Sequence, residues 1–388
     1  MYEFKQVQSA GTDLNDELLK IWVARYLPDL GSISSYVRHH VEERLRLAIA
    51  DESRQATAKY LKSYLESDCT FANRDTQRLL LATGLSADIG ELKNLSHQVY
   101  KLYETLIDCY EQSFIFSPII EYLHTIDTEA GRLQAVELVI PEFEALMLAI
   151  SPFLRELKAI YFSSINQHLI GFMTTHMHFT QQRILGHLSC DEIIWLAPYL
   201  QLLDELIAMP WQRICSIAST TSDRPESVDL VKKMIPKVNA ISAFTYQKAL
   251  RTYSTHTSRQ GRIQSKAVQR SSMRDLSMFQ AYIWLSFLED STAIIEQKLL
   301  PTCLQVFPLT NVRWELVIFA IQAITETIQK QLTPSERALF DTHLEKIQAL
   351  FLNAHPKKRT ASLLKEQLQQ ANLLKNISYT WPPRENAD

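Results

Sequence analysis

Apolar residues recur at spacings of three and four along most of the chain, while strict alternation of apolar and polar residues is almost absent. The first spacing is typical of amphipathic α-helices, and the second would indicate strands. Only 8 residues are glycine, so few positions interrupt a helix. The pattern predicts an all-α fold, a multi-helix bundle or array of about 13–15 helices in two layers and without a sheet.

Proline, glycine and capping residues set the expected helix ends. Ser189–Glu192 and Thr333–Glu336 each have the spacing of a capping box, in which a hydroxyl and a carboxylate satisfy free N–H groups. Ser117–Pro118 and Ser151–Pro152 each resemble an N-cap followed by proline at the first helical position. The expected helices cover residues 13–27, 34–66, 74–83, 87–113, 118–126, 128–139, 141–150, 152–185, 190–208, 210–219, 226–253 with a kink near Pro236, 273–299, 311–331, 334–353 and 360–374.

The order of these elements suggests three regions. Residues 1–150 form an N-terminal helical region, and residues 151–375 form a C-terminal helical region. Within the second, residues 251–274 lose the hydrophobic period and are expected to form a long basic loop. Residues 376–388 are expected to be an extended tail, because Pro382 and Pro383 stop any helix.

Composition and charge favour a globular protein of the cytoplasm. Of 388 residues, 46% are hydrophobic and 21% charged, and the net charge of −3 indicates no general affinity for nucleic acid. The five cysteines are odd in number and lack CxxC spacing, which favours free thiols over disulfides. The N-terminus lacks the pattern of a signal peptide. The most apolar stretch, Val136–Leu154, contains three glutamates, so no membrane span is expected.

A histidine-rich stretch, from His168 to Glu192, raises the question of a metal site. On the expected helix 152–185, His168 and His176 lie on or beside an apolar stripe and are about 12 Å apart, too far to share one ion. His178 is expected to point outward, and His187 to lie in a turn. This geometry favours structural histidines, so no metal and no cofactor are expected. A metal site would have to use His168, His176, His187 or Cys190, completed by distant residues.

The basic segment from Leu230 to Arg274 contains ten Lys or Arg residues and no acidic residue. Such a segment can be a solvated loop docked on the acidic remainder of the chain, or it can bind an acidic protein partner. It can also bind phosphates of nucleic acid, with Tyr253 stacking on a base. The candidate anion- or partner-binding residues are Arg251, Arg259, Arg262, Lys266, Arg270 and Arg274.

The segment Met273–Ser291 is the most aromatic part of the chain, with Phe279, Tyr282, Trp284 and Phe287 on more than one helix face. A helix that is apolar all round is usually buried on every side. We therefore expect it to be the core helix of the C-terminal region. The alternative is that these rings line a pocket for a pigment or another ligand.

Three segments carry a resemblance to a known group. "PWQRIC" (Pro210–Cys215), "MRDLSMFQAYIWL" (Met273–Leu285) and "RWELV" (Arg313–Val317) resemble segments of an uncharacterised group of soluble, all-helical cyanobacterial proteins. The resemblance covers roughly residues 160–330. It implies a bacterial cytosolic setting and assigns no functional residue.

No phosphate-binding, dinucleotide-binding, zinc-protease or hydrolase motif is present in the sequence. The sequence therefore favours a non-enzymatic regulatory or scaffold protein that acts through protein–protein contacts, with residues 230–274 as its docking element. The first alternative is a helical cofactor- or metal-binding protein or enzyme that uses His168 or His176. The second is a protein that binds nucleic acid through the basic segment.

Overall fold

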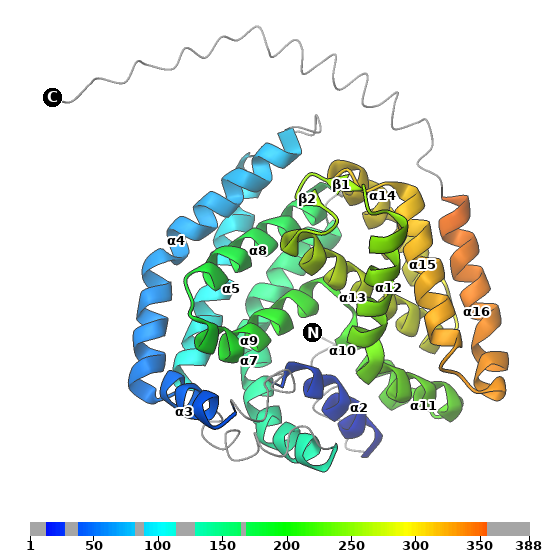
Figure 1. Cartoon of the computed structure of the whole chain (residues 1–388), viewed down its shortest axis with the longest axis horizontal. Helices are drawn as coiled ribbons and strands as arrows, with labels where there is room; N and C mark the ends of the chain where they lie inside the picture. Colours follow the sequence, from blue (N-terminus) through cyan, green and yellow to red (C-terminus); the bar gives the residue numbers. More distant parts are fainter. Residues whose placement is uncertain (1–12, 28–37, 82–88, 114–128, 164–167, 355–388) are drawn as a thin grey trace, which may run out of the picture.

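The computed structural model describes residues 13–27, 38–81, 89–113, 129–163 and 168–354 (Figure 1). Within these ranges the regular secondary structure is helical except for one two-stranded hairpin, which confirms the all-α prediction. The expected helices 118–126 and 360–374 and the expected tail 376–388 lie outside the described residues.

Of the helices before the histidine-rich stretch, α5 packs on both α4 and α7, and α2 packs on α7 (Figure 1). The elements of this part are α2 (Asp13–Val23), the short 3₁₀ turn η1 (Ala24–Tyr26), α3 (Arg38–Ala48), α4 (Asp51–Leu81), α5 (Ile89–Gln112) and α7 (Glu129–Ser163).

The remaining elements surround α13, which lies in the interior of this part of the molecule (Figure 1). They are α8 (His168–Gly186), α9 (Cys190–Ala208), α10 (Trp211–Thr220), α11 (Pro225–Met234), η2 (Ile235–Lys237), α12 (Val238–Thr252), β1 (Thr257–Ser258), β2 (Gly261–Arg262), α13 (Lys266–Leu288), η3 (Ile295–Leu299), α14 (Leu300–Leu309), α15 (Trp314–Gln329) and α16 (Pro334–Asn353).

Several expected helix ends are confirmed. Ser189 accepts a hydrogen bond from the backbone N–H of Glu192, whose carboxylate accepts one from the N–H of Ser189, and Thr333 and Glu336 repeat this reciprocal arrangement. The expected kink at Pro236 is the 3₁₀ turn η2 between α11 and α12. These ends could be predicted because each depends on residues within one helical turn.

Proline did not end a helix where we expected it to. The sequence predicts separate helices 128–139 and 141–150 and an N-cap at Ser151, but α7 runs through Pro141 and Pro152. An internal proline costs a helix about 3 kcal/mol. The cost is offset here because a continuous apolar stripe of α7 is buried. It consists of Val136, Val139, Phe143, Leu146, Ile150, Leu154 and Leu157.

Three other helix predictions were wrong. The expected helix 152–185 is two helices, since α7 ends at Ser163 and α8 begins at His168. The expected helices 34–66 and 74–83 are replaced by α3 and an unbroken α4 over residues 51–81. The expected helix 273–299 ends at Leu288, beyond which Asp290 has φ = 51°. Polar side chains within residues 67–73 interrupt the apolar pattern from which the helix was predicted. Helix α4 nevertheless continues through them, with Cys69 and Ala72 buried.

The predicted basic loop 251–274 is mostly ordered secondary structure. Helix α12 continues to Thr252, and α13 already begins at Lys266. Between them β1 and β2 form an antiparallel hairpin, with Thr257 opposite Arg262 and Ser258 opposite Gly261. Gly261 has φ = 126°, a conformation that other residues rarely adopt, so glycine permits this tight turn.

Helix α13 is the core helix that the sequence predicts. Phe279, Trp284 and Phe287 are buried, and the ring of Trp284 stacks on Phe340 of α16 with 4.8 Å between the ring centres. Tyr282 is half-buried at the side facing α14. The hydrophobic cluster around α13 continues into α2, α5 and α7.

Charged contacts link the early and late helices. Arg25 and Tyr26 of η1 both contact the buried carboxylate of Glu205 on α9; the oxygen atoms of Tyr26 and Glu205 are 2.6 Å apart.

The domain boundary that the sequence predicts between residues 150 and 151 falls inside α7. The assignment of two regions stays a prediction.

No single helix among the described residues has the length and hydropathy of a membrane span. The pair α9 and α10, bent by 70° at its break, passes the same test of length and composition when taken together.

Candidate functional site: a pocket between α8, α12, α13 and α15

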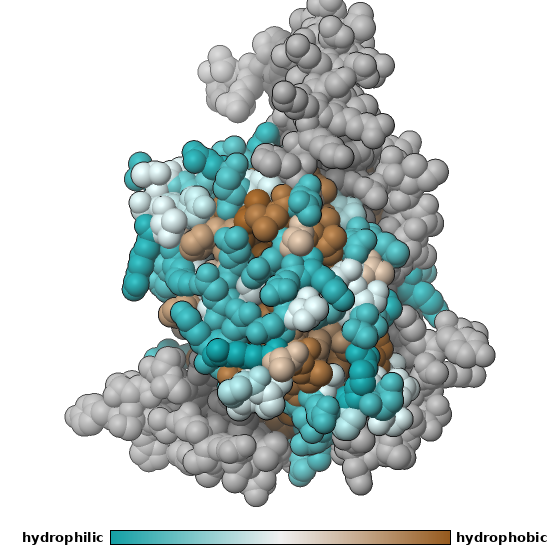
Figure 2. Space-filling view, turned by 90° about the vertical axis from the view of Figure 1, so that its right-hand side faces the viewer, coloured by the Kyte–Doolittle hydropathy of each residue, from teal (hydrophilic) through white to brown (hydrophobic). Residues whose placement is uncertain are grey.

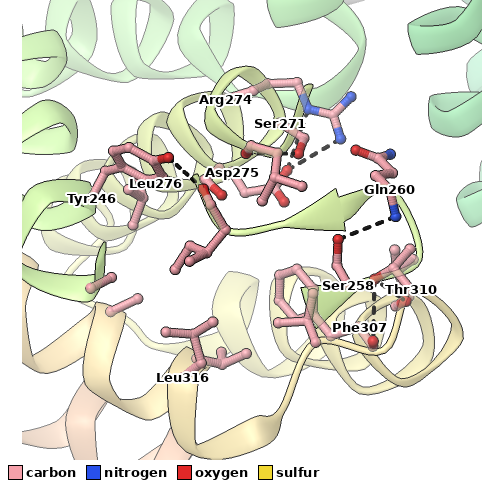
Figure 3. A pocket seen from close by; sticks show the side chains of 18 of the residues that line it. Tyr246, Ser258, Gln260, Ser271, Arg274, Asp275, Leu276, Phe307, Thr310 and Leu316 are labelled. Atoms are coloured by element: carbon pink, nitrogen blue, oxygen red, sulfur yellow. Dashed lines mark hydrogen bonds and ion pairs between the residues drawn. The ribbon is translucent and has the colours of Figure 1, made fainter. Parts of the chain in front are cut away.

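A pocket of about 130 Å³ lies where the hairpin meets α13 (Figure 3). Its wall is formed by α8, α12, the hairpin, α13, α14 and α15. Leu276, Phe307 and Leu316 provide apolar surface, and Arg274 and Gln260 lie near each other (Figure 3). The pocket therefore combines apolar surface with a few polar side chains.

The hairpin closes one side of the pocket and is fixed there by hydrogen bonds. The backbone N–H of Arg259 donates to the carbonyl of Thr310 at 2.9 Å. The side-chain amide of Asn311 donates to the carbonyl of Thr257 at 2.8 Å, and the hydroxyl of Tyr246 donates to the carbonyl of Ile263 at 2.6 Å. These contacts hold Gln260 at the pocket.

Four buried polar atoms of the pocket lining have no hydrogen-bond partner among the described residues. They are Thr245 Oγ1, His256 Nε2, Gln260 Oε1 and Arg274 Nη1. Most buried polar groups in folded proteins are hydrogen-bonded, and an unsatisfied one costs about 1–3 kcal/mol. Four such atoms around one cavity indicate a place where a polar ligand or ordered water completes the hydrogen bonding.

Arg274 is the only one of these groups that carries a charge at neutral pH. Its Nε and Nη2 contact the Asp275 carboxylate at 3.3 and 3.2 Å, and its Nη1 lies 3.6 Å from Asp204 Oδ1. Burial raises the pKa of both aspartates, and the charge of Arg274 opposes that rise. The two aspartates raise the pKa of Arg274 although burial lowers it. The cation is therefore stable and keeps one nitrogen without a hydrogen bond.

His178 supplies an uncharged imidazole to the same pocket. The sequence predicts that it points outward, but it is only 8% exposed and lines the cavity. The prediction failed because α8 begins at His168 and is a separate helix from α7, so it faces its neighbours differently. Burial, together with the positive charges of Arg274 and Arg270, lowers the pKa of His178 to about 3.

His176 is fully buried, as the apolar stripe predicts. Neither ring nitrogen has a hydrogen-bond partner among the described residues, and burial lowers the pKa of the imidazole to about 4. Its ring lies beside Phe172, with 5.8 Å between the ring centres. His176 is therefore a neutral residue of the core, and it does not line the pocket.

The remaining metal candidates do not converge. His187 Nε2 is 2.8 Å from Asp68 Oδ2, and Cys190 is exposed at the start of α9. His168 begins α8, but its side chain lies outside the described residues. Among the described side chains, no group of three or more His, Cys, Asp or Glu could hold a metal ion.

The basic candidates separate into two sets. Arg274 lines the pocket, while five others are exposed on or beside the hairpin: Arg251, Arg259, Arg262, Lys266 and Arg270. Of these five, Arg270 donates to Gln182 at 2.6 Å. Of the basic candidates that the sequence indicates, Arg274 therefore lines the pocket. The sequence had predicted it as part of a basic docking loop.

Sequence reasoning missed Thr245, His256, Gln260 and Asp275 as pocket residues. They come from three elements that are brought together only by the packing of α12 and the hairpin on α13. The available signal was the hydroxyl- and amide-rich composition of residues 251–274 next to the aromatic helix. That composition indicates a polar surface but does not identify which residues line a pocket.

Comparison with known proteins finds one family match, and it covers most of the residues that line this pocket. Residues 211–350 match the family described as "Phycobilisome protein". The match covers well under half of the 388 residues. It includes all pocket residues except those of α8. No curated protein and no solved structure matches the chain.

The match agrees in part with the resemblance seen in the sequence. The segments Met273–Leu285 and Arg313–Val317 lie within the matched residues, and Pro210–Cys215 begins one residue before them. The match agrees with the all-helical fold and with the cyanobacterial resemblance of these segments.

Proposed function

We propose that this protein is a non-enzymatic binding protein of the light-harvesting apparatus, and that its pocket takes one ring and one carboxylate of an open-chain tetrapyrrole of the bilin class, without a covalent bond. The observation that carries the proposal is the set of four unsatisfied polar atoms around one cavity in the segment that matches the phycobilisome family. The proposal replaces the expectation that no cofactor is bound.

The residues of the pocket suit such a ligand. Bilins carry carboxylates, ring N–H groups and flat apolar rings. Arg274 Nη1 would donate to a carboxylate, and Gln260 Oε1 would accept from an N–H group. Phe307 and Leu316 supply apolar surface for a ring. The bound pigment would supply absorption of visible light.

The enclosed space is large enough for one ring of such a ligand. A cavity of about 150 Å³ holds benzene, and this pocket measures about 130 Å³. A second cavity of about 50 Å³ adjoins it and shares Thr174, Arg274 and Asp275 with it. The Arg274–Asp275 pair therefore lies between two spaces, as suits an elongated ligand.

The absence of a thiol in the pocket lining supports non-covalent binding. None of the residues that line the larger cavity is a cysteine. Cys303 lines the smaller one, but it is buried, and burial raises the pKa of its thiol well above the usual value. A thiol of this kind is a poor nucleophile because it stays protonated.

The proposal can be tested by producing the full chain in cells that synthesise a bilin. The purified protein is expected to carry visible absorbance, and denaturation in acidic urea followed by gel filtration should separate the pigment from the chain. Pigment that stays with the denatured chain would contradict non-covalent binding. Protein without visible absorbance would contradict the proposal as a whole.

A second proposal concerns partners. Arg251, Arg259, Arg262 and Lys266 are exposed and make no ion pair with any described residue. Unpaired cations grouped on one surface suit an acidic protein surface. We expect the association with acidic antenna subunits to weaken with salt and when Arg259, Arg262 and Arg270 are changed to Ala. If the same variants instead lose retention on heparin or nucleic acid alone, the nucleic-acid alternative holds.

A further inference from the structure

One guanidinium beside the pocket is shared by two carboxylates. Arg274 contacts Asp275, the next residue of α13, at 3.2 Å, and its Nη1 lies 3.6 Å from Oδ1 of Asp204 on α9. We call Arg274, Asp204 and Asp275 the charge triad. One positive and two negative charges give the ionised triad a net charge of −1. Any anion that binds Arg274 therefore joins a group that is already negative.

The charge triad is shielded from water. On the side of the molecule that Figure 2 shows, hydrophobic residues form separate patches within a mostly hydrophilic surface, and water and salt weaken the interactions between charges at such a surface. The side chains of Arg274, Asp204 and Asp275 are only 22%, 14% and 24% exposed. Repulsion between like charges is stronger here, because less water screens it.

Asp275 is the carboxylate of the charge triad that a ligand would meet first. It lines the larger and the smaller cavity beside Arg274, whereas Asp204 lines neither (Figure 3). A ligand carboxylate that accepts from Arg274 brings three carboxylates around one guanidinium and lowers the local net charge from −1 to −2. A like charge within about 4–6 Å disfavours the ionised form of a carboxylate. The arrangement therefore favours one proton shared by two of the three carboxylates.

The titratable groups on the neighbouring helices do not cancel this charge. Burial, together with the charges of Arg274 and Arg270, lowers the pKa of His178 on α8 to about 3, so its imidazole is neutral near pH 7. Burial raises the pKa of Tyr103 on α5 and that of Cys303 on α14, and both groups are neutral as well. Arg270 is charged, but it is exposed to water.

The groups on the remaining elements around the charge triad are paired or neutral. The carboxylate of Glu205 on α9 is ion-paired with Arg25 at 3.1 Å. Burial raises the pKa of Tyr246 on α12. Burial and the charge of Arg313 lower the pKa of His256, which lines the larger cavity. His256 is therefore the rival of Asp275 as the group that a nearby anion would protonate.

We infer that a carboxylate binds in this pocket together with one proton from the solvent, which Asp275 then shares with the ligand. The proton makes Asp275 a neutral donor, so that an O–H···O⁻ hydrogen bond replaces the repulsion between two anions. The complex holds one more proton than the separate chain and ligand, so the affinity rises as the pH falls. The inference rests on the proposed function, because it needs a ligand that brings a carboxylate to Arg274.

The test is a titration of the full chain with biliverdin at several pH values between about 6 and 8, followed by visible absorbance. The dissociation constant should fall by about tenfold for each pH unit, as linkage to one proton requires. Calorimetric titrations in two buffers with different ionisation enthalpies count the protons directly, and about one per bound ligand is expected. Biliverdin dimethyl ester, which has no carboxylate, is the control ligand and should bind without uptake of a proton.

Asp275→Asn identifies the group that takes up the proton. The variant keeps the size of the side chain and removes its charge, so it should bind biliverdin near pH 8 about as tightly as the wild type does near pH 6, and without proton uptake. A purely structural role of Asp275 predicts weaker binding at every pH instead. Asp191→Asn, which removes a carboxylate of α9 that is hydrogen-bonded to Arg44, is the matched control and should keep the proton uptake.

The results distinguish a failure of the inference from a failure of the proposed function. A chain that binds no biliverdin at any pH contradicts both. Binding with equal affinity near pH 6 and pH 8, and without proton uptake, leaves the proposed function in place and overturns the inference. So does an uptake that persists in Asp275→Asn and is lost in His256→Gln or His178→Gln, because a histidine would then hold the proton.

Discussion

The guanidinium of Arg274 on α13 and the carboxylate of Asp204 on α9 form an ion pair, with 3.6 Å between Nη1 and Oδ1. The pair joins α13, which lies inside the phycobilisome-like segment, to α9, which precedes it. The same guanidinium contacts Asp275 and borders both cavities. One side chain therefore couples the packing of two parts of the chain to the pocket.

Replacing Arg274 should destabilise the fold as well as the pocket. In Arg274→Met, Asp204 and Asp275 lose their shared cation, and we expect the free energy of unfolding to fall by about 2–4 kcal/mol. Arg274→Lys keeps the charge but not the planar fork, so its loss should be smaller. Urea unfolding followed by circular dichroism measures both. Equal stability of Arg274→Met and the wild type would show that the ion pair does not contribute to the stability of the fold.

Removing the His176 imidazole should stabilise the protein. The side chain is fully buried with both nitrogens unpaired among the described residues, so His176→Leu removes unsatisfied polar atoms and fills the site with an apolar group. We expect a gain of about 1–2 kcal/mol at pH 7 in urea unfolding. A loss of stability would indicate that the imidazole has a partner beyond the described residues.

The buried histidines should also make the fold sensitive to acid. Burial lowers the pKa of His176 and His343 to about 4 and that of His178 to about 3. Below about pH 6.5 the unfolded chain binds protons that the folded chain does not, so stability falls as the pH falls from 6.5 toward 4. The slope should approach about 1.4 kcal/mol per pH unit for each histidine.

A histidine variant provides the control for that slope. His343 accepts or donates a hydrogen bond with Ser286 at 2.9 Å, and His343→Gln keeps a polar group there without a titrating ring. Its unfolding free energy should depend less steeply on pH between 6.5 and 4. An unchanged slope would mean that His343 does not contribute.

Two adjacent residues of α16 should differ sharply in their effect on stability. Phe340 is fully buried against Trp284, whereas Leu339 is 40% exposed. We expect Phe340→Ala to cost about 3–5 kcal/mol, since it removes a ring and leaves a cavity. Leu339→Ala should cost less than about 1 kcal/mol. Thermal and urea unfolding compare the two, and similar losses would contradict the packing of α16 on α13.

The capping box at the start of α16 allows a smaller prediction. Thr333→Ala removes the hydroxyl that accepts from the N–H of Glu336, so about 1 kcal/mol of stability should be lost. Ser67→Ala, a substitution in the middle of α4, changes no cap and should alter the free energy of unfolding by only a few tenths of a kcal/mol. An equal effect of the two substitutions would contradict the role of the cap.

The sequence predicted those features that depend on local chemistry. The capping boxes, the kink at Pro236 and the burial of Trp284 each follow from a few neighbouring residues or from one helix period. The continuity of α7 through Pro141 and the burial of His178 could not be predicted, because tertiary packing decides both. The pocket was only partly predictable. Arg274 was a candidate, but Thr245, His256 and Gln260 line the pocket with it only after α12 and the hairpin pack onto α13.

The central claim, that the pocket beside Arg274 binds a bilin, is tested most directly by titrating the purified full chain with biliverdin and following its visible absorbance. We predict a saturable change with one site per chain. Arg274→Lys and Gln260→Leu should weaken binding at least tenfold, whereas Arg262→Ala, an exposed residue of the same hairpin, should bind as the wild type does. Absence of saturable binding, or equal affinity of the wild type and both pocket variants, would contradict it.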